Sequence, residues 1–413
     1  ISVSESLRLV QEYAPINFNG MHASLRQNGV YLLVAKMIDG LGLVYARALR
    51  RELNAKLIIV GDELMPAPAE WDRWLATHGA MHPVNQLINA LQRLGREGED
   101  YLFIPANTHQ VDSLTNAIAT GEARFGAING VFHADVMGDE AACELASLDE
   151  DEYARITREK MPGASALASA LNGHSPDFVL LQSSLSTLVG GHGFCAYAAA
   201  SAYFDAFAEN QSASGTPWYA IDWDACLPPL MNESSENLTQ TALMELAIKP
   251  DEVWTASLAV LGQQQFSRVA VTNRSLTGRR HTLHTESAAP KLLDNRDRPA
   301  LETPYVAPRT ELERVVADEM GNLLGISAIG VDDDFFALGG HSLLAIQAVT
   351  RLRKTYGVEL PMRAFLYGTP TAAGIAAVLE ESLAEIDSST IATVENLLDD
   401  LEGDLQDHAA KSD

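Results

Sequence analysis

VYLLVAKMIDGLGLVYARALRREL, residues 30–53, contains the clearest indication of the fold. An apolar run at its start ends in a short loop that contains Gly40 and Gly42, and an amphipathic helical pattern follows directly. This order of strand, loop and helix is typical of the first unit of a doubly wound α/β fold, in which the loop and the helix N-terminus hold the phosphates of a dinucleotide. The loop nevertheless carries fewer glycines than such a phosphate site requires.

The same alternation continues to about residue 225. Helix-period segments separate five more short apolar runs, which lie at 55–61, 100–106, 128–134, 177–184 and 218–223. Nearly continuous apolar character suits strands that are covered on both faces, as in a parallel sheet. The sequence therefore predicts an α/β domain over 29–283 with a Rossmann-type, doubly wound parallel sheet and right-handed crossovers.

A second, smaller domain is predicted after this region. Residues 284–308 are rich in Pro and polar side chains and lack a period, which predicts a linker. Amphipathic helices are expected at 309–325 and 342–357, so we expect a small all-α four-helix bundle over 309–385 and an acidic tail at 386–413. The apolar face of the first helix comprises Leu312, Val315, Val316, Met320 and Leu323.

Charge and cysteine usage exclude several classes of protein. The 413 residues carry a formal net charge of −26, which argues against nucleic acid as a partner. No apolar run reaches the length of a membrane span and no signal peptide is recognisable, so we expect no membrane partner, and the start at Ile1 indicates a piece of a longer protein. Cys143, Cys195 and Cys226 are few and widely spaced, which indicates a reducing, cytoplasmic location and no metal site.

The last quarter of the chain is its most acidic part. Residues 306–413 contain 7 Lys and Arg residues against 19 Asp and Glu residues. Such a module commonly docks on basic partner surfaces, but the same charges also suit a solvated surface. The sequence leaves both interpretations open.

The most specific motif is DDDFFALGGHSLLAIQ, residues 332–347. It resembles the carrier-protein core of polyketide synthases and nonribosomal peptide synthetases, and this resemblance implies that Ser342 receives 4′-phosphopantetheine. The physical chemistry agrees, because Gly339 and Gly340 permit a tight turn and a helix N-terminus favours a phosphodiester. The plainer alternative is that Ser342 is only a helix cap.

The carrier resemblance also implies partners. The chain would tether an acyl or peptidyl thioester and be modified by a phosphopantetheinyl transferase. It would work beside upstream and downstream synthase domains that condense, load or release the chain.

A second resemblance lies in SSLSTLVGGHGFCAYAAASAYFDAFA, residues 183–208. This stretch is similar to the active site of modular polyketide synthase ketoreductases, which belong to the short-chain dehydrogenase superfamily. The resemblance implies that Ser184 and Tyr197 donate hydrogen bonds to a ketone oxygen, and that Lys160 lowers the pKa of the Tyr197 phenol. Ser201 stands where the family usually has Asn. The ketoreductase resemblance also implies that residues 1–28 are the remnant of a structural half of the ketoreductase.

A structural interpretation of the same residues also stays open. Ser184 could cap the end of a strand, and Tyr197 could be a packed aromatic side chain.

The ketoreductase resemblance makes the phosphate loop informative. Gly40 and Gly42 keep the closing part of the family's pattern, but the other positions depart from it. Asp62 stands where an acidic residue binds a ribose 2′-hydroxyl and favours NADH, and Asn107 replaces the Asp that usually faces adenine. The positions where the chain loses glycines or gains side chains near the phosphates are Lys36, Met37, Asp39, Asp135 and Val136. We therefore expect weak or absent binding of NADPH, with NADH the better ligand if either binds.

Three hypotheses follow for the α/β domain. It is a pseudo-ketoreductase with a structural role, an active NAD(P)H-dependent ketoreductase acting on the carrier-bound keto thioester, or a site for nicotinamide-free acid–base chemistry by Ser184, Tyr197 and Lys160. The altered phosphate loop favours the first.

Overall fold

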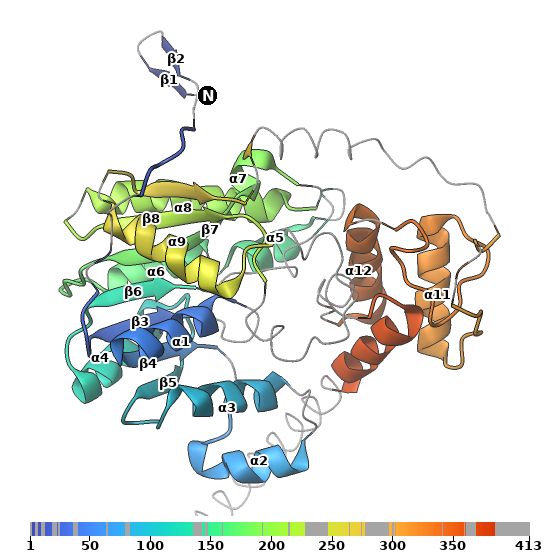
Figure 1. Cartoon of the computed structure of the whole chain (residues 1–413), viewed down its shortest axis with the longest axis horizontal. Helices are drawn as coiled ribbons and strands as arrows, with labels where there is room; N and C mark the ends of the chain where they lie inside the picture. The colour runs from blue at the N-terminus through green and yellow to red at the C-terminus, as the bar shows by residue number, and fades with distance from the viewer. Residues whose placement is uncertain are drawn as a thin grey trace, which may run out of the picture.

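The computed structural model shows an α/β domain and a smaller helical bundle (Figure 1). It describes residues 2–4, 7–9, 13–18, 23, 25–35, 40–62, 65–78, 83–134, 143, 145, 148–158, 160–191, 193–213, 215–227, 247–263, 265–273, 275–276, 297–299, 301, 303–340, 342–358, 360 and 369–384.

Seven parallel strands form the central sheet, in the order β5-β4-β3-β6-β7-β8-β9. The strands are β3 (Val30–Val34), β4 (Lys56–Gly61), β5 (Tyr101–Pro105), β6 (Gly130–His133), β7 (Val179–Ser184), β8 (Trp218–Trp223) and β9 (Arg268–Val271). Chain order reverses between β3 and β6, the switch point where doubly wound sheets bind ligands at the carboxyl ends of their strands. The doubly wound sheet predicted from the sequence is confirmed, and β9 is a strand that the sequence reading missed.

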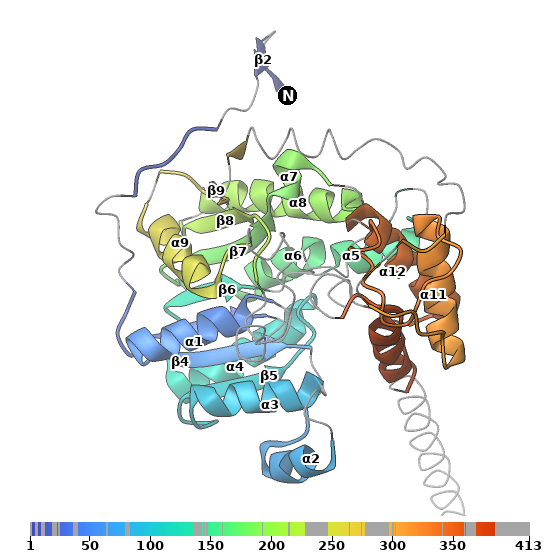
Figure 2. The ribbon, with the colours of Figure 1, turned by 45° about the vertical axis from the view of Figure 1, so that its right-hand side comes forward.

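Helices cover both faces of the sheet (Figures 1 and 2). One face packs against α1 (Gly42–Leu53), α3 (Pro83–Leu94) and α9 (Pro250–Gly262). The other packs against α4 (Val111–Phe125), α6 (Met161–Ala170) and α8 (Cys195–Ser212). The remaining described elements of this domain are α5 (Glu150–Thr157), α7 (Ser186–Val189), α2 (Trp71–Thr77), the 3-10 turn η1 (Pro68–Glu70) and the antiparallel pair β1 (Ser2–Ser4) and β2 (Leu7–Leu9).

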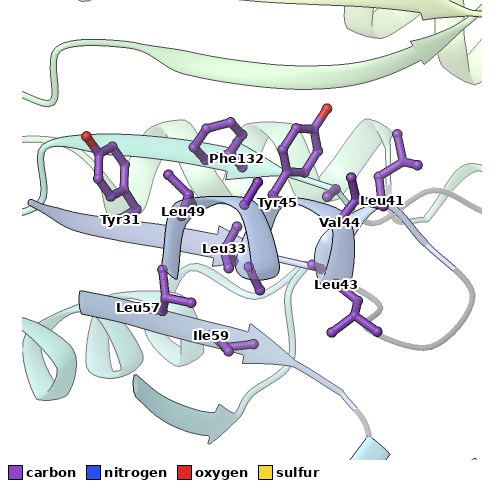
Figure 3. Close-up of a cluster of buried hydrophobic side chains, with 14 of the residues drawn as sticks. Tyr31, Leu33, Leu41, Leu43, Val44, Tyr45, Leu49, Leu57, Ile59 and Phe132 are labelled. Atoms are coloured by element: carbon purple, nitrogen blue, oxygen red, sulfur yellow. The ribbon is translucent and has the colours of Figure 1, made fainter. Parts of the chain in front are cut away.

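The alternation of side chains along β3 explains how one strand serves both layers. Tyr31 and Leu33 join the cluster under α1, whereas Leu32 and Val34 join the cluster on the opposite face. Figure 3 shows Tyr45 of α1 beside Phe132 of β6, with the two ring centroids 4.7 Å apart. A strand that is apolar on both faces can be satisfied only between two layers of helices, which is why its sequence reads as a continuous apolar run.

The helical bundle has its own core. Its described helices are α11 (Glu311–Leu324), α12 (Ser342–Tyr356) and a helix over 372–384. Val316 and Met320 of α11 are fully buried, and the other three residues of the predicted apolar face, Leu312, Val315 and Leu323, pack partly buried against the same core. A capping box at Thr310 and Glu313 starts α11, and Gly325, with φ of 65°, ends it.

The described end of the expected linker is attached to this bundle. Arg298 donates to both carboxylate oxygens of Asp333, at 2.7 and 2.6 Å, and the Val331 backbone N–H donates to the Val306 carbonyl. Asp333 is fully buried, and although burial opposes it, the Arg298 hydrogen bonds hold the pKa of its carboxyl below the ordinary value. We therefore propose that the bundle begins near residue 297 rather than at 309.

The segment before the sheet is described only in part. Ile16, Phe18 and Leu25 pack against the cluster under α1. This packing shows that the segment contributes to the α/β domain, while its origin as a remnant stays a proposal.

None of the helices within the described ranges is both long and apolar enough to cross a bilayer.

Candidate functional site

Lys160 lies directly before α6 and is only 1% exposed. Its Nζ donates to the Gln182 carbonyl of β7 at 3.0 Å. The same atom lies 4.7 Å from the ring centroid of Tyr197 and 4.9 Å from that of Phe204. Since a buried ammonium is costly, this carbonyl and the two aromatic faces supply the negative electrostatic surroundings that it needs. The structure thus brings Lys160 and Tyr197 together from distant parts of the sequence.

Gln182 connects this arrangement to the core. Its Oε1 accepts hydrogen bonds from the Tyr45 hydroxyl, at 3.0 Å, and from the Trp223 indole. The Tyr45 hydroxyl also lies 3.0 Å from Ser257 Oγ, and burial raises the pKa of this phenol far above its ordinary value. Residues of α1, α9, β7 and β8 therefore fix the strand whose carbonyl holds Lys160. Gln182 was not predicted from the sequence, although a lone amide in an apolar strand is a usable signal.

Ser184 is the last residue of β7 and is half-buried. Its Oγ accepts from the backbone N–H of Ser186, the first residue of the short helix α7, at 3.2 Å. This local bond matches the structural interpretation of Ser184. Its role toward a substrate stays a prediction.

Tyr197 and Ser201 lie one turn apart on α8 and are both buried. The Ser201 carbonyl accepts from Ser183 Oγ at 3.1 Å, while Ser201 Oγ has no hydrogen-bond partner among the described residues. A buried hydroxyl without a partner has an unused hydrogen-bonding capacity next to Tyr197, as a proton relay through Ser201 requires. The catalytic roles of both residues stay predictions.

A buried ionic cluster supports α8 further along. Arg268 of β9 lies 2.9 Å from an Asp205 oxygen and 2.8 Å from an Asp222 oxygen. Both carboxylates are almost completely buried, and one guanidinium cannot neutralise two negative charges. Burial and the neighbouring Asp222 together raise the pKa of Asp205 to about 7. The sequence analysis missed this cluster, because its residues are distant in the chain.

The nucleotide end of the sheet is described in part. Ala35 and Ala134 continue the ends of β3 and β6, and the buried Gly42 is the first residue of α1. Gly40 is also buried. The described backbone fits a dinucleotide phosphate at the N-terminus of α1. Five positions at which the chain departs from the family near the phosphates lie outside the described residues: Lys36, Met37 and Asp39 in the loop, and Asp135 and Val136 after β6.

Asp62 and Asn107, the other two residues predicted to contact the nucleotide, differ in their surroundings. Asp62 follows β4 and is exposed, so its carboxylate is accessible at the place expected for the ribose. Asn107 follows β5, and its Oδ1 accepts from the His109 backbone N–H at 3.1 Å, while its own N–H donates to Ser113 Oγ. Asn107 therefore closes its own turn. An adenine-binding role for it stays a prediction.

The bundle positions Ser342 as the first residue of α12. Gly339 has φ of +99°, and a Cβ on Gly340 would lie 2.4 Å from the Phe335 ring. Only glycine fits at both positions, so the turn into the helix depends on this pair. The first turn of α12 contains no acidic residue, and the N-terminus of a helix is a favourable place for a phosphodiester.

Two family models match this chain, one in each of its two domains. Residues 29–227 match the KR domain, and residues 314–379 match the phosphopantetheine attachment site. The chain joins a KR domain to a carrier domain. The carrier motif and the ketoreductase-type fold predicted from the sequence are confirmed, as is phosphopantetheine as the prosthetic group of this domain type.

The relatives are large synthases. The carrier region is 47% identical to a dimodular nonribosomal peptide synthase from Bacillus subtilis (strain 168) over 74 residues, which is 18% of this chain and 3% of that protein. Polyketide synthase PksM from the same organism is 24% identical over 363 residues, 84% of this chain and 8% of its own length. The chain thus spans only a small part of these relatives.

Solved ketoreductases are also similar in structure to this chain. An N-terminal ketoreductase from the macrolactin assembly line matches with a TM-score of 0.48 and 22% identity, covering 63% of this chain and 48% of that chain. A ketoreductase domain from the bacillaene assembly line matches with a TM-score of 0.49 and 19% identity, covering 64% of this chain and 60% of that chain.

Proposed function

We propose that this chain is a segment of a polyketide or nonribosomal peptide assembly line and acts in the cytoplasm. Its carrier domain tethers the growing acyl or peptidyl chain as a thioester of 4′-phosphopantetheine on Ser342. The observation that carries this proposal is the position of Ser342 at the start of α12, directly after the glycine turn at 339–340. A phosphopantetheinyl transferase is the required partner, and neighbouring synthase domains would load, extend or release the chain.

We further propose that the KR domain does not perform ordinary NADPH-dependent reduction. Asp62 carries its support among the described residues, because an exposed carboxylate at the end of β4 repels the 2′-phosphate that distinguishes NADPH from NADH. Asn107 is engaged in its own turn, and the loop sequence adds Lys36, Met37 and Asp39. The domain then serves as a pseudo-ketoreductase that holds its neighbours in place.

One observation favours a second candidate function. Lys160 is buried against the Tyr197 ring, in the surroundings that would help a phenol to give up its proton. If the domain reacts, Tyr197 would transfer a proton to or from a carbonyl compound on the carrier. Reduction with NADH and nicotinamide-free enolisation or elimination both use that proton transfer.

The carrier proposal is tested by labelling the full chain. Incubation with a broad-specificity phosphopantetheinyl transferase and coenzyme A is expected to add one phosphopantetheine, visible by intact-protein mass spectrometry. Ser342→Ala should remove this mass addition completely, since one hydroxyl carries the group. Ser327→Ala, a serine of the same domain, is the matched control and should be labelled like the unaltered chain. Labelling that persists in Ser342→Ala contradicts the assignment.

The proposal for the KR domain is tested by titrating the chain with NADPH and NADH while nicotinamide fluorescence is followed. NADPH is expected to bind weakly or not at all, and NADH to be the better ligand. A micromolar dissociation constant for NADPH, or reduction of a simple ketone with NADPH, would overturn the pseudo-ketoreductase proposal.

A further inference from the structure

Phe194 contacts both domains. It lies directly before α8, and its ring centroid is 6.1 Å from that of Tyr197. On one side it packs against a small apolar cluster of the KR domain that contains Cys143, Ile156 and Tyr197. On the other side it packs against the hydrophobic core of the carrier domain. One half-buried aromatic side chain therefore joins the carrier to the immediate surroundings of Tyr197.

Opposite charges on the two domains influence each other near this aromatic contact. Helix α5 begins with an acidic first turn, Glu150, Asp151 and Glu152, after the capping residue Asp149. Helix α5 lies close to α12 in the view of Figure 2. Two hydrogen bonds from Arg155 hold the pKa of the Glu152 carboxyl below its ordinary value, and the positive charge of Arg353 in the last turn of α12 acts in the same direction.

The carrier itself positions Arg353. Its Nε donates to the Leu360 carbonyl at 3.0 Å, which holds the guanidinium group against its own domain before any contact with α5. A charge that is already ordered loses less conformational entropy on docking than a free side chain does. The polarity is the reverse of that expected from the acidic carrier as a whole, since here the carrier supplies the positive charge and the KR domain the negative one.

We propose that Phe194 and the acidic first turn of α5 form the docking surface for this chain's own carrier domain, which binds through Arg353 at the end of α12. The proposal rests on the carrier role of the C-terminal domain and identifies its partner surface. Ser342 stands eleven positions before Arg353 on the same helix, a distance of about 16 Å along its axis. The attachment site therefore lies on the same helix as the charged contact of the docked carrier.

Carbodiimide crosslinking of the full chain tests the charged part of the surface. In Arg353→Lys, the introduced amine is expected to form an amide with a carboxylate of residues 149–152, which peptide mapping of the monomeric fraction detects. Arg351→Lys is the matched control, because Arg351 already pairs with Glu319 of the carrier at 2.9 Å and should crosslink there. If both variants crosslink only within the carrier, the docking surface is wrong.

Hydrogen exchange tests the aromatic part. Phe194→Ala should accelerate amide exchange in α5 and α12 by about tenfold or more, as expected when the aromatic contact between the two domains is lost. Phe266→Ala removes an equal ring from an exposed position of the KR domain and should change neither helix. Equal exchange in Phe194→Ala and the unaltered chain would overturn the proposal.

Neither measurement requires phosphopantetheine or a nicotinamide. If Ser342 of the unaltered chain is not labelled but the crosslink forms, the carrier role is rejected and the docked contact is kept. If Ser342 is labelled but the crosslink does not form, only the docking surface is rejected.

Discussion

The two ends of the candidate site are built differently. At the predicted catalytic end, Lys160, Gln182 and Tyr197 come from separate elements and are buried against one another. At the nucleotide end, Asp62 is exposed and Asn107 is bound within its own turn. One end is held by long-range contacts, the other by local ones.

This difference indicates which residues can be substituted without destabilising the fold. Replacing a buried polar residue leaves its partners unsatisfied, so the whole cluster resists change. An exposed strand-end residue such as Asp62 has no such partners among the described contacts and can change freely. Retention of the buried contacts of Lys160 and Tyr197 is therefore compatible with a domain that has a structural role and performs no reaction.

We expect the largest effect from Asp205→Asn, which tests how a buried carboxylate of α8 contributes to the free energy of unfolding. The folded-state pKa of Asp205 is raised to about 7, so its stabilising contribution is complete below its unfolded pKa and is lost as pH rises through about 7. Between pH 5 and pH 8, the free energy of unfolding should fall by about 2–3 kcal/mol more in the unaltered chain than in Asp205→Asn. Urea denaturation at both pH values measures this difference.

The control for that experiment is Asp251→Asn, which alters a carboxylate whose side chain is 89% exposed. Its pH dependence should equal that of the unaltered chain. If the pH dependence of Asp205→Asn equals that of the unaltered chain, the raised pKa of Asp205 is contradicted.

Asp62→Arg sharpens the comparison at the nucleotide end. Replacing an anion by a cation beside the 2′-phosphate should improve NADPH affinity by about tenfold, or about 1.4 kcal/mol, and leave NADH affinity nearly unaltered or weaker. Fluorescence titration with both nucleotides measures the ratio. Asp72→Arg makes the same charge change on the exposed face of α2 and should not alter it. Equal NADPH affinity in both variants would assign the obstacle to the loop at 36–39 instead.

Lys160→Met addresses the catalytic end directly. The substitution removes a buried charge, keeps most of the side-chain volume and leaves the Gln182 carbonyl without its donor. These effects oppose each other, so the free energy of unfolding should change by no more than about 1 kcal/mol. A loss of several kcal/mol would show that Lys160 is a structural residue and would remove the main argument for chemistry at this end.

The smallest effect is expected for Tyr197→Phe. Only a hydroxyl is lost, so the melting temperature should stay nearly constant, and the parent synthase should still form its product if the domain is structural. Deleting residues 30–280 should abolish that product. An unprocessed acyl-pantetheine on Ser342 in Tyr197→Phe, seen by intact-protein mass spectrometry, would break the comparison and favour the second candidate function.

The sequence predicted those features that leave local patterns. Buried strands such as β3 and β7 read as apolar runs, and the glycine turn before Ser342 lies in one contiguous motif. β9 is short and only partly buried, so its pattern was too weak to recognise. The same limit applies to the Asp205–Arg268 contact and to Phe194, whose partners are distant in the chain. Contacts of this kind depend on topology, which no window of sequence contains.

The ion pair between Arg298 and Asp333 has a consequence for how often the two domains meet. It fixes the start of the carrier 22 positions after Leu276. A chain of that length spans at most about 75 Å, so the carrier is confined to a sphere in which one molecule corresponds to about 1 mM. At this effective concentration, an encounter surface with only millimolar intrinsic affinity would be occupied about half of the time. The contact at Phe194 can therefore be weak enough to release the carrier to other domains and still be visited often.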